Sequence, residues 1–191
     1  MYIAAAILAW VGASLVVLAD GRRGLAVGLG LLTAGLAVLA SPSAALPGAS
    51  AIAAGGLIAS WQCWRSGPAA WGIMPAGSTA RLVLCVASGL VSLWVAASVT
   101  TGSGAPLRFA VMVVLGLMAA RILGGREATV LLTSVAGLAL ILAVAPGIAT
   151  TSQDFIPATA GGLVAAGVMF LPSGLVKRAS GKAAQADRNG A

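Results

Sequence analysis

Long apolar segments separated by very short polar turns constrain this chain more than any other feature. Residues 2–19 contain no charged side chain and are followed at once by Asp20-Gly21-Arg22-Arg23, after which residues 24–40 are again uncharged. About 20 apolar residues suffice for a helix to cross the hydrocarbon core of a bilayer. A helix also satisfies its own backbone hydrogen bonds, as lipid requires. Residues 2–40 therefore predict a hairpin of two transmembrane helices.

The same pattern recurs along the chain. Four further apolar segments are clear, and they cover residues 82–100, 107–123, 128–145 and 158–176. Residues 48–64 form a weaker segment, because Gly55, Gly56 and Gln62 interrupt it, and this segment either spans the membrane or is re-entrant. The whole chain is 60% hydrophobic and 8% charged, against about 25% charged residues in soluble domains.

These segments predict an all-α integral membrane protein, a bundle of about seven transmembrane helices. We expect a single polytopic transmembrane domain over residues 1–178. Residues 179–191 are small, polar and charged, and we expect them to form a short, disordered cytoplasmic tail.

The distribution of basic residues predicts the orientation of this bundle. If all seven segments cross, Arg108 falls on one side and the other ten of the eleven basic residues fall on the opposite side. Those ten are Arg22, Arg23, Arg65, Arg81, Arg121, Arg126, Lys177, Arg178, Lys182 and Arg188. Because basic residues concentrate on the cytoplasmic side, we expect an outside N-terminus, a cytoplasmic C-terminus and a location in the bacterial cytoplasmic (inner) membrane. A re-entrant segment 48–64 would spoil this segregation, so the asymmetry favours seven spans.

The net charge of +7 does not indicate a nucleic-acid partner. The basic residues occur singly or in pairs between apolar runs, whereas a phosphate-binding surface needs a basic stripe. We expect the lipid bilayer and other membrane protein subunits as partners, and no nucleic acid.

Small residues recur at helix-packing spacing in three of the predicted helices. They are Gly24, Gly28 and Gly35 in the second, Ser88, Ser92 and Ala96 in the fourth, and Gly161 and Ala165 in the seventh. Such stripes let helix backbones approach closely in lipid. Two interpretations stay open: packing within the bundle, or docking of another subunit.

The sequence offers few ionisable side chains that could serve catalysis, metal binding or ion-coupled transport. It contains no histidine, which removes the usual ligand for haem and for most metal sites. Its four acidic residues all lie in predicted turns, loops or the tail: Asp20, Glu127, Asp154 and Asp187. Ion-coupled transporters generally hold such a charge at mid-membrane. We therefore predict no catalytic site, no metal site and no enzyme activity.

A few individual residues remain as candidates. Arg108 and Asp154 are expected on the outer side, where they form a candidate ion pair between helix ends, although solvated loop charges are the simpler interpretation. Cys63 and Cys85 are expected to pack as small apolar side chains. The sequence leaves any cofactor unknown, because a bound lipid, quinone or pigment can be held by packing alone.

The favoured hypothesis is a non-catalytic accessory subunit of a larger bacterial membrane complex. The alternative is a small transporter or channel component for a neutral or lipidic solute. Transport would be favoured if the intramembrane polar side chains converged on one water-accessible cavity. Those side chains are Thr33, Gln62, Ser88, Ser92 and Thr133.

Overall fold

The computed structural model describes residues 1–42, 45–65, 78–99, 104–124, 128–148 and 156–170, and these residues form seven α-helices and one short 3₁₀ helix. The helices are α1 (Tyr2–Leu18), α2 (Arg22–Ala40), α3 (Ala45–Arg65), α4 (Ser78–Val99), α5 (Ala105–Gly124), α6 (Ala128–Val144) and α7 (Ile156–Met169), with η1 (Ala145–Ile148) after α6. The prediction of an all-α chain with seven helices is confirmed.

The clearest differences from the predicted bounds lie at helix N-termini. α3 begins at Ala45, ahead of the predicted segment 48–64, and includes Pro47 in its first turn. Proline is tolerated in a first helical turn because its missing N–H would have no intrahelical partner there. α3 is one continuous helix of 21 residues, so the interruption expected at Gly55 and Gly56 does not break it. The predicted end of the seventh segment, residues 171–176, lies outside the described residues.

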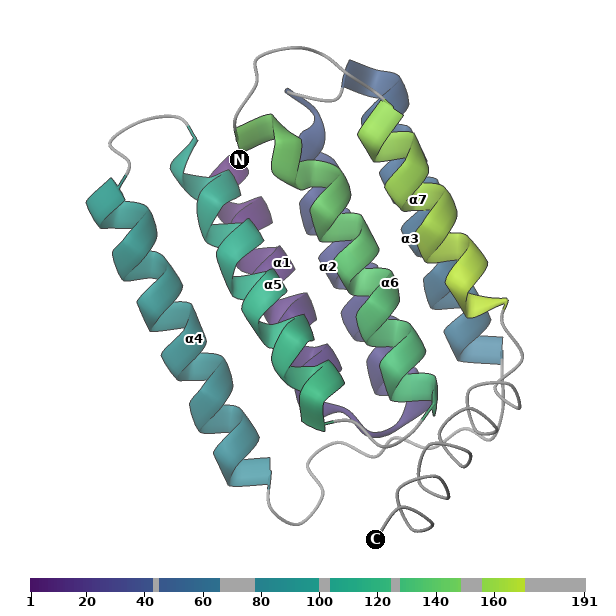
Figure 1. The fold of residues 1–191 in the computed structure, drawn as a ribbon, viewed down its shortest axis with the longest axis horizontal. Coiled ribbons are helices and arrows are strands. Elements are labelled where there is room, and N and C mark those ends of the chain that lie inside the picture. The colour runs from purple at the N-terminus through teal and green to yellow at the C-terminus, as the bar shows by residue number, and fades with distance from the viewer. Residues whose placement is uncertain (43–44, 66–77, 100–103, 125–127, 149–155, 171–191) are drawn as a thin grey trace, which may run out of the picture.

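The seven helices form two facing layers with one helix at the edge (Figure 1). α1, α2 and α3 pack in sequence in one layer, and α5, α6 and α7 pack in the same order in front of them. α1 faces α5, α2 faces α6 and α3 faces α7, and the helices of each facing pair run in the same direction. The second layer therefore repeats the arrangement of the first.

α4 is the odd helix of this arrangement. α3 ends at one end of the bundle and α5 begins at the other, and α4 carries the chain between these ends (Figure 1). It packs on α5 and α1 at the edge of the bundle. Most of its large apolar side chains are exposed, namely Leu82, Val83, Leu84, Val86, Leu90, Val91, Leu93 and Trp94. The seven helices thus form two layers of three helices each and one peripheral helix.

The contact between α1 and α2 depends on glycine. A Cβ added to Gly28 would lie 2.9 Å from the carbonyl oxygen of Gly12, and one added to Gly35 would lie 2.6 Å from the carbonyl oxygen of Ala5. Side chains larger than hydrogen at these points would push the backbones apart. Close approach of this kind lets long helices make many weak van der Waals contacts.

Over residues 3–13 of α1, the buried residues are alanine and glycine, and the exposed ones include large apolar side chains. Its buried residues include Ala5, Ala9 and Gly12, whereas Ile3 and Ile7 are exposed. A soluble bundle shows the opposite preference, with large aliphatic side chains filling the core and charged residues covering the surface. The other helices bury large side chains such as Leu29, Leu117 and Leu140, but they too expose apolar side chains: Val27, Leu57, Ile58, Met112, Leu115, Val135, Leu142, Leu163 and Val164, besides those of α1 and α4.

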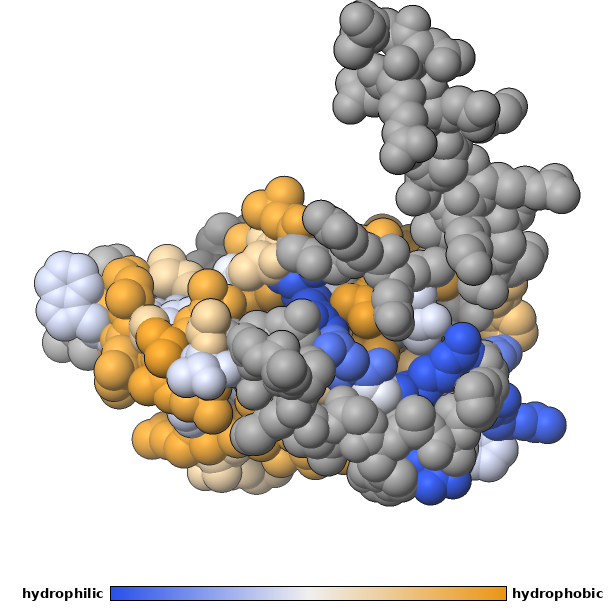
Figure 2. Space-filling model, turned by 90° about the horizontal axis from the view of Figure 1, so that it is seen from below, coloured by the Kyte–Doolittle hydropathy of each residue, from blue (hydrophilic) through white to orange (hydrophobic). Residues whose placement is uncertain are grey.

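Charged side chains of the described residues gather at one end of the bundle. Arg22 and Arg23 begin α2, Arg65 ends α3 and Arg121 lies in the last turn of α5. Figure 2 looks at this end and shows hydrophilic residues concentrated toward the α2 and α3 side, with apolar residues over the α4 side. Arg108 is at the opposite end, in the first turn of α5.

By length and composition, two of the described helices qualify as candidate membrane spans, over Arg22–Ala40 and Ala105–Leu123. The other apolar helices of the described residues are shorter: Tyr2–Leu18, Leu82–Val95, Thr129–Val144 and Ile156–Val168. The core helix of a soluble protein meets the same criterion. The number of such helices is therefore weaker evidence for a membrane location than the apolar side chains on the outer surface of the bundle.

Candidate functional site

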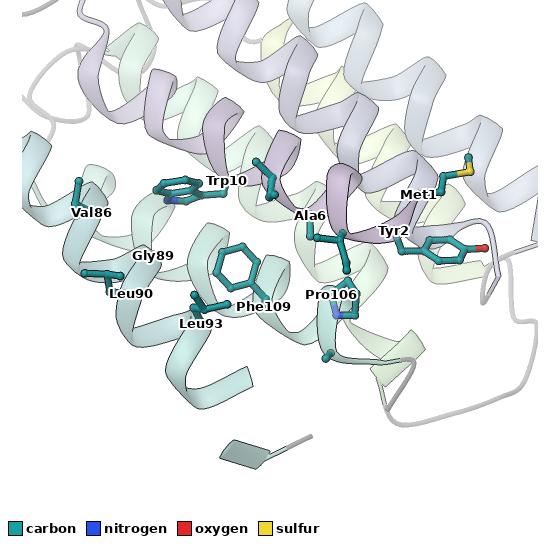
Figure 3. Close-up of a pocket in the computed structure, with 13 residues that line it drawn as sticks. Met1, Tyr2, Ala6, Trp10, Val86, Gly89, Leu90, Leu93, Pro106 and Phe109 are labelled. Atoms are coloured by element: carbon teal, nitrogen blue, oxygen red, sulfur yellow. The ribbon is translucent and has the colours of Figure 1, made fainter. Parts of the chain in front are cut away.

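An apolar cavity of about 830 Å³ lies between α1, α4 and α5. Its lining comes from three separate stretches of the chain: Met1, Tyr2, Ile3, Ala6, Ile7 and Trp10; Val86, Gly89, Leu90 and Leu93; and Ala105, Pro106 and Phe109. Figure 3 shows the Trp10 ring extending from α1 toward α4, with Leu93 and Phe109 beside the same space. The volume is within the range of small-molecule sites, which is about 300–1,000 Å³.

The cavity exists because α4 touches α1 at one level. The Trp10 indole Nε1 donates a hydrogen bond to the carbonyl oxygen of Cys85 at 3.4 Å. One turn further along α4, a Cβ on Gly89 would lie 2.9 Å from the Trp10 ring. Glycine at this position therefore allows the indole to pack directly on the α4 backbone. This contact closes the inner end of the cavity.

The opposite end of the bundle holds an ion pair between a buried arginine and a partly exposed aspartate. Arg121 is 5% exposed, and its Nη2 donates to Asp20 Oδ1 at 2.5 Å and to the carbonyl oxygen of Ala19 at 2.9 Å. Ala19 is the C-cap of α1, whose terminal carbonyls have no intrahelical partner. Arg121 therefore joins the ends of the two parallel helices α1 and α5, across the two layers.

Helix termini favour the charges of this pair. Arg121 is in the last turn of α5, where the negative end of the helix dipole attracts a cation. Asp20 precedes Gly21, the N-cap of α2, where the positive end attracts an anion. The Nε atom of Arg121 has no hydrogen-bond partner among the described residues. We interpret the pair as a structural clamp, because Arg121 Nη2 binds both the Asp20 carboxylate and the C-terminal end of α1.

Two arginine–tryptophan contacts lie at the same end. The Arg23 guanidinium is 5.6 Å from the centre of the Trp64 ring, and that of Arg65 is 5.9 Å from the Trp61 ring. Both distances fit cation–π contact, which contributes about 0.5–1 kcal/mol at exposed sites. The Arg23–Trp64 contact connects the start of α2 to the end of α3. Trp71, which the sequence groups with these tryptophans, lies outside the described residues.

The glycines of the second helix, which were predicted to form a packing or docking stripe, face the interior of the helical bundle. Gly24 is buried in α2. Gly28 and Gly35 lie against α1, as described above. In α7, a Cβ on Gly161 would lie 2.8 Å from the Ala139 carbonyl oxygen of α6, and Ala165 is buried. The structure thus places these residues at contacts between helices of the same chain.

The remaining predicted residues do not form a single site. Ser88 is half-buried and donates to the carbonyl oxygen of Cys85 at 3.0 Å, and Ser92 is buried in α4. Ala96 lies in α4, but its side chain is not described. Arg108 is partly buried in α5, whereas Asp154 lies outside the described residues, so the predicted Arg108–Asp154 ion pair lies outside them too.

The polar side chains that would favour transport do not line the cavity. Thr33 donates to the carbonyl oxygen of Leu29 at 2.7 Å, and Thr133 donates to that of Thr129 at 2.8 Å, so each hydroxyl bonds within its own helix. Thr133 Oγ1 also lies 4.0 Å from the sulfur of Cys63. Cys63 and Cys85 are both buried free thiols. None of the five candidate polar residues contributes to the lining of this cavity.

Sequence reasoning missed both the cavity and the buried arginine. Arg121 is counted in the sequence only as one of the basic residues of the cytoplasmic face. Its spacing from Val114 and Leu117, at seven and four residues, places it on the buried face of α5, and that signal could have found it. The cavity had no comparable signal, because its lining is ordinary apolar sequence from three distant stretches.

Comparison of the chain with protein-family profiles, with curated proteins and with solved structures finds no match.

Proposed function

We propose that this chain is a multi-pass protein of the bacterial cytoplasmic membrane and serves as a non-catalytic accessory subunit of a larger membrane complex. The observation that carries the membrane part is the packing of residues 3–13 of α1, with alanine and glycine inside and isoleucine outside, together with the apolar side chains exposed on the other helices. Exposure of such an apolar surface to water would be strongly unfavourable. Exposure to lipid would not be, and small residues at helix contacts are what packing in lipid favours.

The basic end of the bundle supports an orientation for this proposal. Arg22, Arg23, Arg65 and Arg121 share the end that we assign to the cytoplasm. Tryptophans beside two of these arginines suit the interface between hydrocarbon and water. The N-terminus of α1 is then on the outer side.

We expect the chain to stay in the membrane pellet after washing with alkaline carbonate, and to enter solution only with detergent. The reason is the apolar outer surface, which would be exposed to water in any soluble form. Fractionation of membranes followed by immunoblotting measures this. A chain found in the supernatant without detergent would refute the membrane assignment.

The accessory role is supported by α4. This helix adds little to the core, since it packs only at the edge of α1 and α5, yet it presents a long apolar outer face. The hydroxyls of Thr33 and Thr133 donate to their own helices, and that of Ser60 donates to the Ala26 carbonyl oxygen of α2, so these groups support packing more than a solute pathway. We therefore assign the outer face of α4 to contact with a larger partner subunit.

Alanine at both Val91 and Trp94 should separate the chain from its complex. Both side chains are on the exposed face of α4 and outside the cavity lining, and truncating a tryptophan anchor at an interface typically costs more than about 1 kcal/mol. In native gels of membranes solubilised in mild detergent, we expect the wild-type chain at high mass and the variant near the mass of the single chain.

The matched control replaces Leu163 and Val164, which are exposed on α7, by alanine. This control should leave the high-mass band unchanged. A wild-type chain that migrates as a strict monomer would contradict the accessory role, whereas equal loss from both variants would contradict the choice of α4 as the docking face.

A further inference from the structure

The cavity between α1, α4 and α5 has the depth of one leaflet. Along α1 its lining extends from Met1 to Trp10, and nine helical steps at about 1.5 Å each give about 14 Å. The hydrocarbon core of a bilayer is about 30 Å thick. The cavity therefore covers about half of that thickness, on the side away from the basic end of the bundle.

The closed inner end of the cavity excludes a transmembrane helix as its occupant. The Trp10 indole is hydrogen-bonded to the backbone of α4 and packs on Gly89, so α1 and α4 meet there. A helix with side chains is about 10 Å wide and must continue through the membrane. A narrower ligand that enters from one leaflet and ends near Trp10 has no such obstacle.

The lining defines the chemistry of that ligand. Ile3, Ile7, Leu90, Leu93 and Phe109 offer aliphatic and aromatic surface. The indole N–H of Trp10 already donates to Cys85, and Tyr2, whose hydroxyl is the other polar side-chain group of the lining, is near the outer end. A polar solute would lose its hydrogen bonds in this space at a cost of several kcal/mol. A hydrocarbon chain would restore the van der Waals contacts that an empty space forfeits.

We propose that this cavity is a lipid site that holds one acyl chain of an outer-leaflet phospholipid, with the chain end against Trp10 and the head group at the level of Tyr2. The proposal rests on the membrane placement given under Proposed function. The acyl chain fills the space between α4 and the α1–α5 pair, so the lipid completes the packing of the peripheral helix.

The test uses the full chain in liposomes that contain phosphatidylglycerol with a photoreactive diazirine at the end of one acyl chain. After illumination, peptide mapping compares adducts on the cavity segments 2–10 and 86–93 with adducts on Leu163 and Val164 of α7, which report general contact with lipid. We expect selective labelling of the cavity segments near Trp10. Two variants should remove that excess by filling the cavity: Ile7→Trp, at a side chain 49% exposed and so free to accept more volume, and Ala105→Phe.

Matched controls carry the same changes outside the cavity. Ile58→Trp is on the exposed face of α3, and Ala87→Phe is exposed on α4 but outside the lining. Both should keep the wild-type ratio of adducts. Equal ratios in the cavity-filling variants, the controls and the wild type would overturn the lipid site. Absence of adducts on α7 as well would instead show that the membrane placement is wrong.

Discussion

Replacement of Asp20 by alanine should lower the free energy of unfolding by up to about 3–5 kcal/mol, the range for a fully buried ion pair that loses one partner. Arg121 is 5% exposed and would keep only the Ala19 carbonyl as a partner. Most of its side chain is enclosed by the bundle, and its Nη2 would lose its charged partner. The cost therefore comes mainly from leaving a cation buried, and less from the lost attraction itself.

The reverse change, Arg121→Met, should cost less. Asp20 is 35% exposed and can be solvated when its partner is removed, and methionine retains much of the apolar stem of arginine. The double variant D20A/R121M should be more stable than D20A alone, because it removes the buried charge that D20A leaves behind. This order of stabilities distinguishes an ion pair from simple packing.

Heating in detergent with a thiol-reactive fluorescent dye measures these differences. Cys63 and Cys85 are buried and free, so the dye reacts when the bundle opens. Arg65→Ala is the control, since this arginine is exposed and its contact with Trp61 is of the cation–π kind, which contributes about 0.5–1 kcal/mol. A D20A midpoint that matches R65A would contradict the clamp.

A methyl group at Gly12 should be the most damaging small substitution in α1. The new Cβ would overlap sterically with the Leu32 backbone nitrogen and would lie 2.7 Å from the Gly28 carbonyl oxygen. Both obstacles are backbone atoms, which cannot rotate away as a side chain can. α1 and α2 must separate, so we expect Gly12→Ala to lose at least the roughly 1–3 kcal/mol typical of overpacking.

Gly116→Ala is the matched control for this prediction. Gly116 is in α5, and a Cβ there would meet nothing within 4 Å. Alanine is favoured over glycine inside a helix by about 0.5–1 kcal/mol, so G116A should be neutral or slightly stabilising. The same dye assay should therefore give a clear loss of stability for G12A and none for G116A, and a loss of similar size in both would contradict the close α1–α2 contact.

The number and approximate positions of the helices were predictable because they depend on local sequence. Uncharged runs of helical length are separated by Asp20-Gly21-Arg22-Arg23 and by residues with strong turn preferences, and the structure places helix boundaries close to these signals. The bounds were less accurate at the starts of α3 and α4, which begin at Ala45 and Ser78 and not at residues 48 and 82. Pro47 did not prevent the earlier start of α3, because proline fits a first helical turn.

The partners of individual residues were not predictable. Arg121 and Asp20 are 101 positions apart in sequence, and their pairing follows from the parallel alignment of α1 and α5. The stripe of Gly28 and Gly35 indicated close packing, but only the fold decided that α1 is the helix it meets. The cavity is lined by three stretches of the chain that come together where α4 contacts Trp10.

The sequence by itself determined that the chain forms seven apolar helices. It also predicted that most of the basic side chains lie at one end of the helical bundle. The tertiary structure decided which helix faces meet, which arginine is buried and where the edge helix leaves a space. The physical reason is that the buried and exposed faces of these helices are both apolar, as Ala9 and Ile7 of α1 illustrate. Hydropathy therefore marks the helices but cannot orient them, and shape at the backbone contacts does so instead.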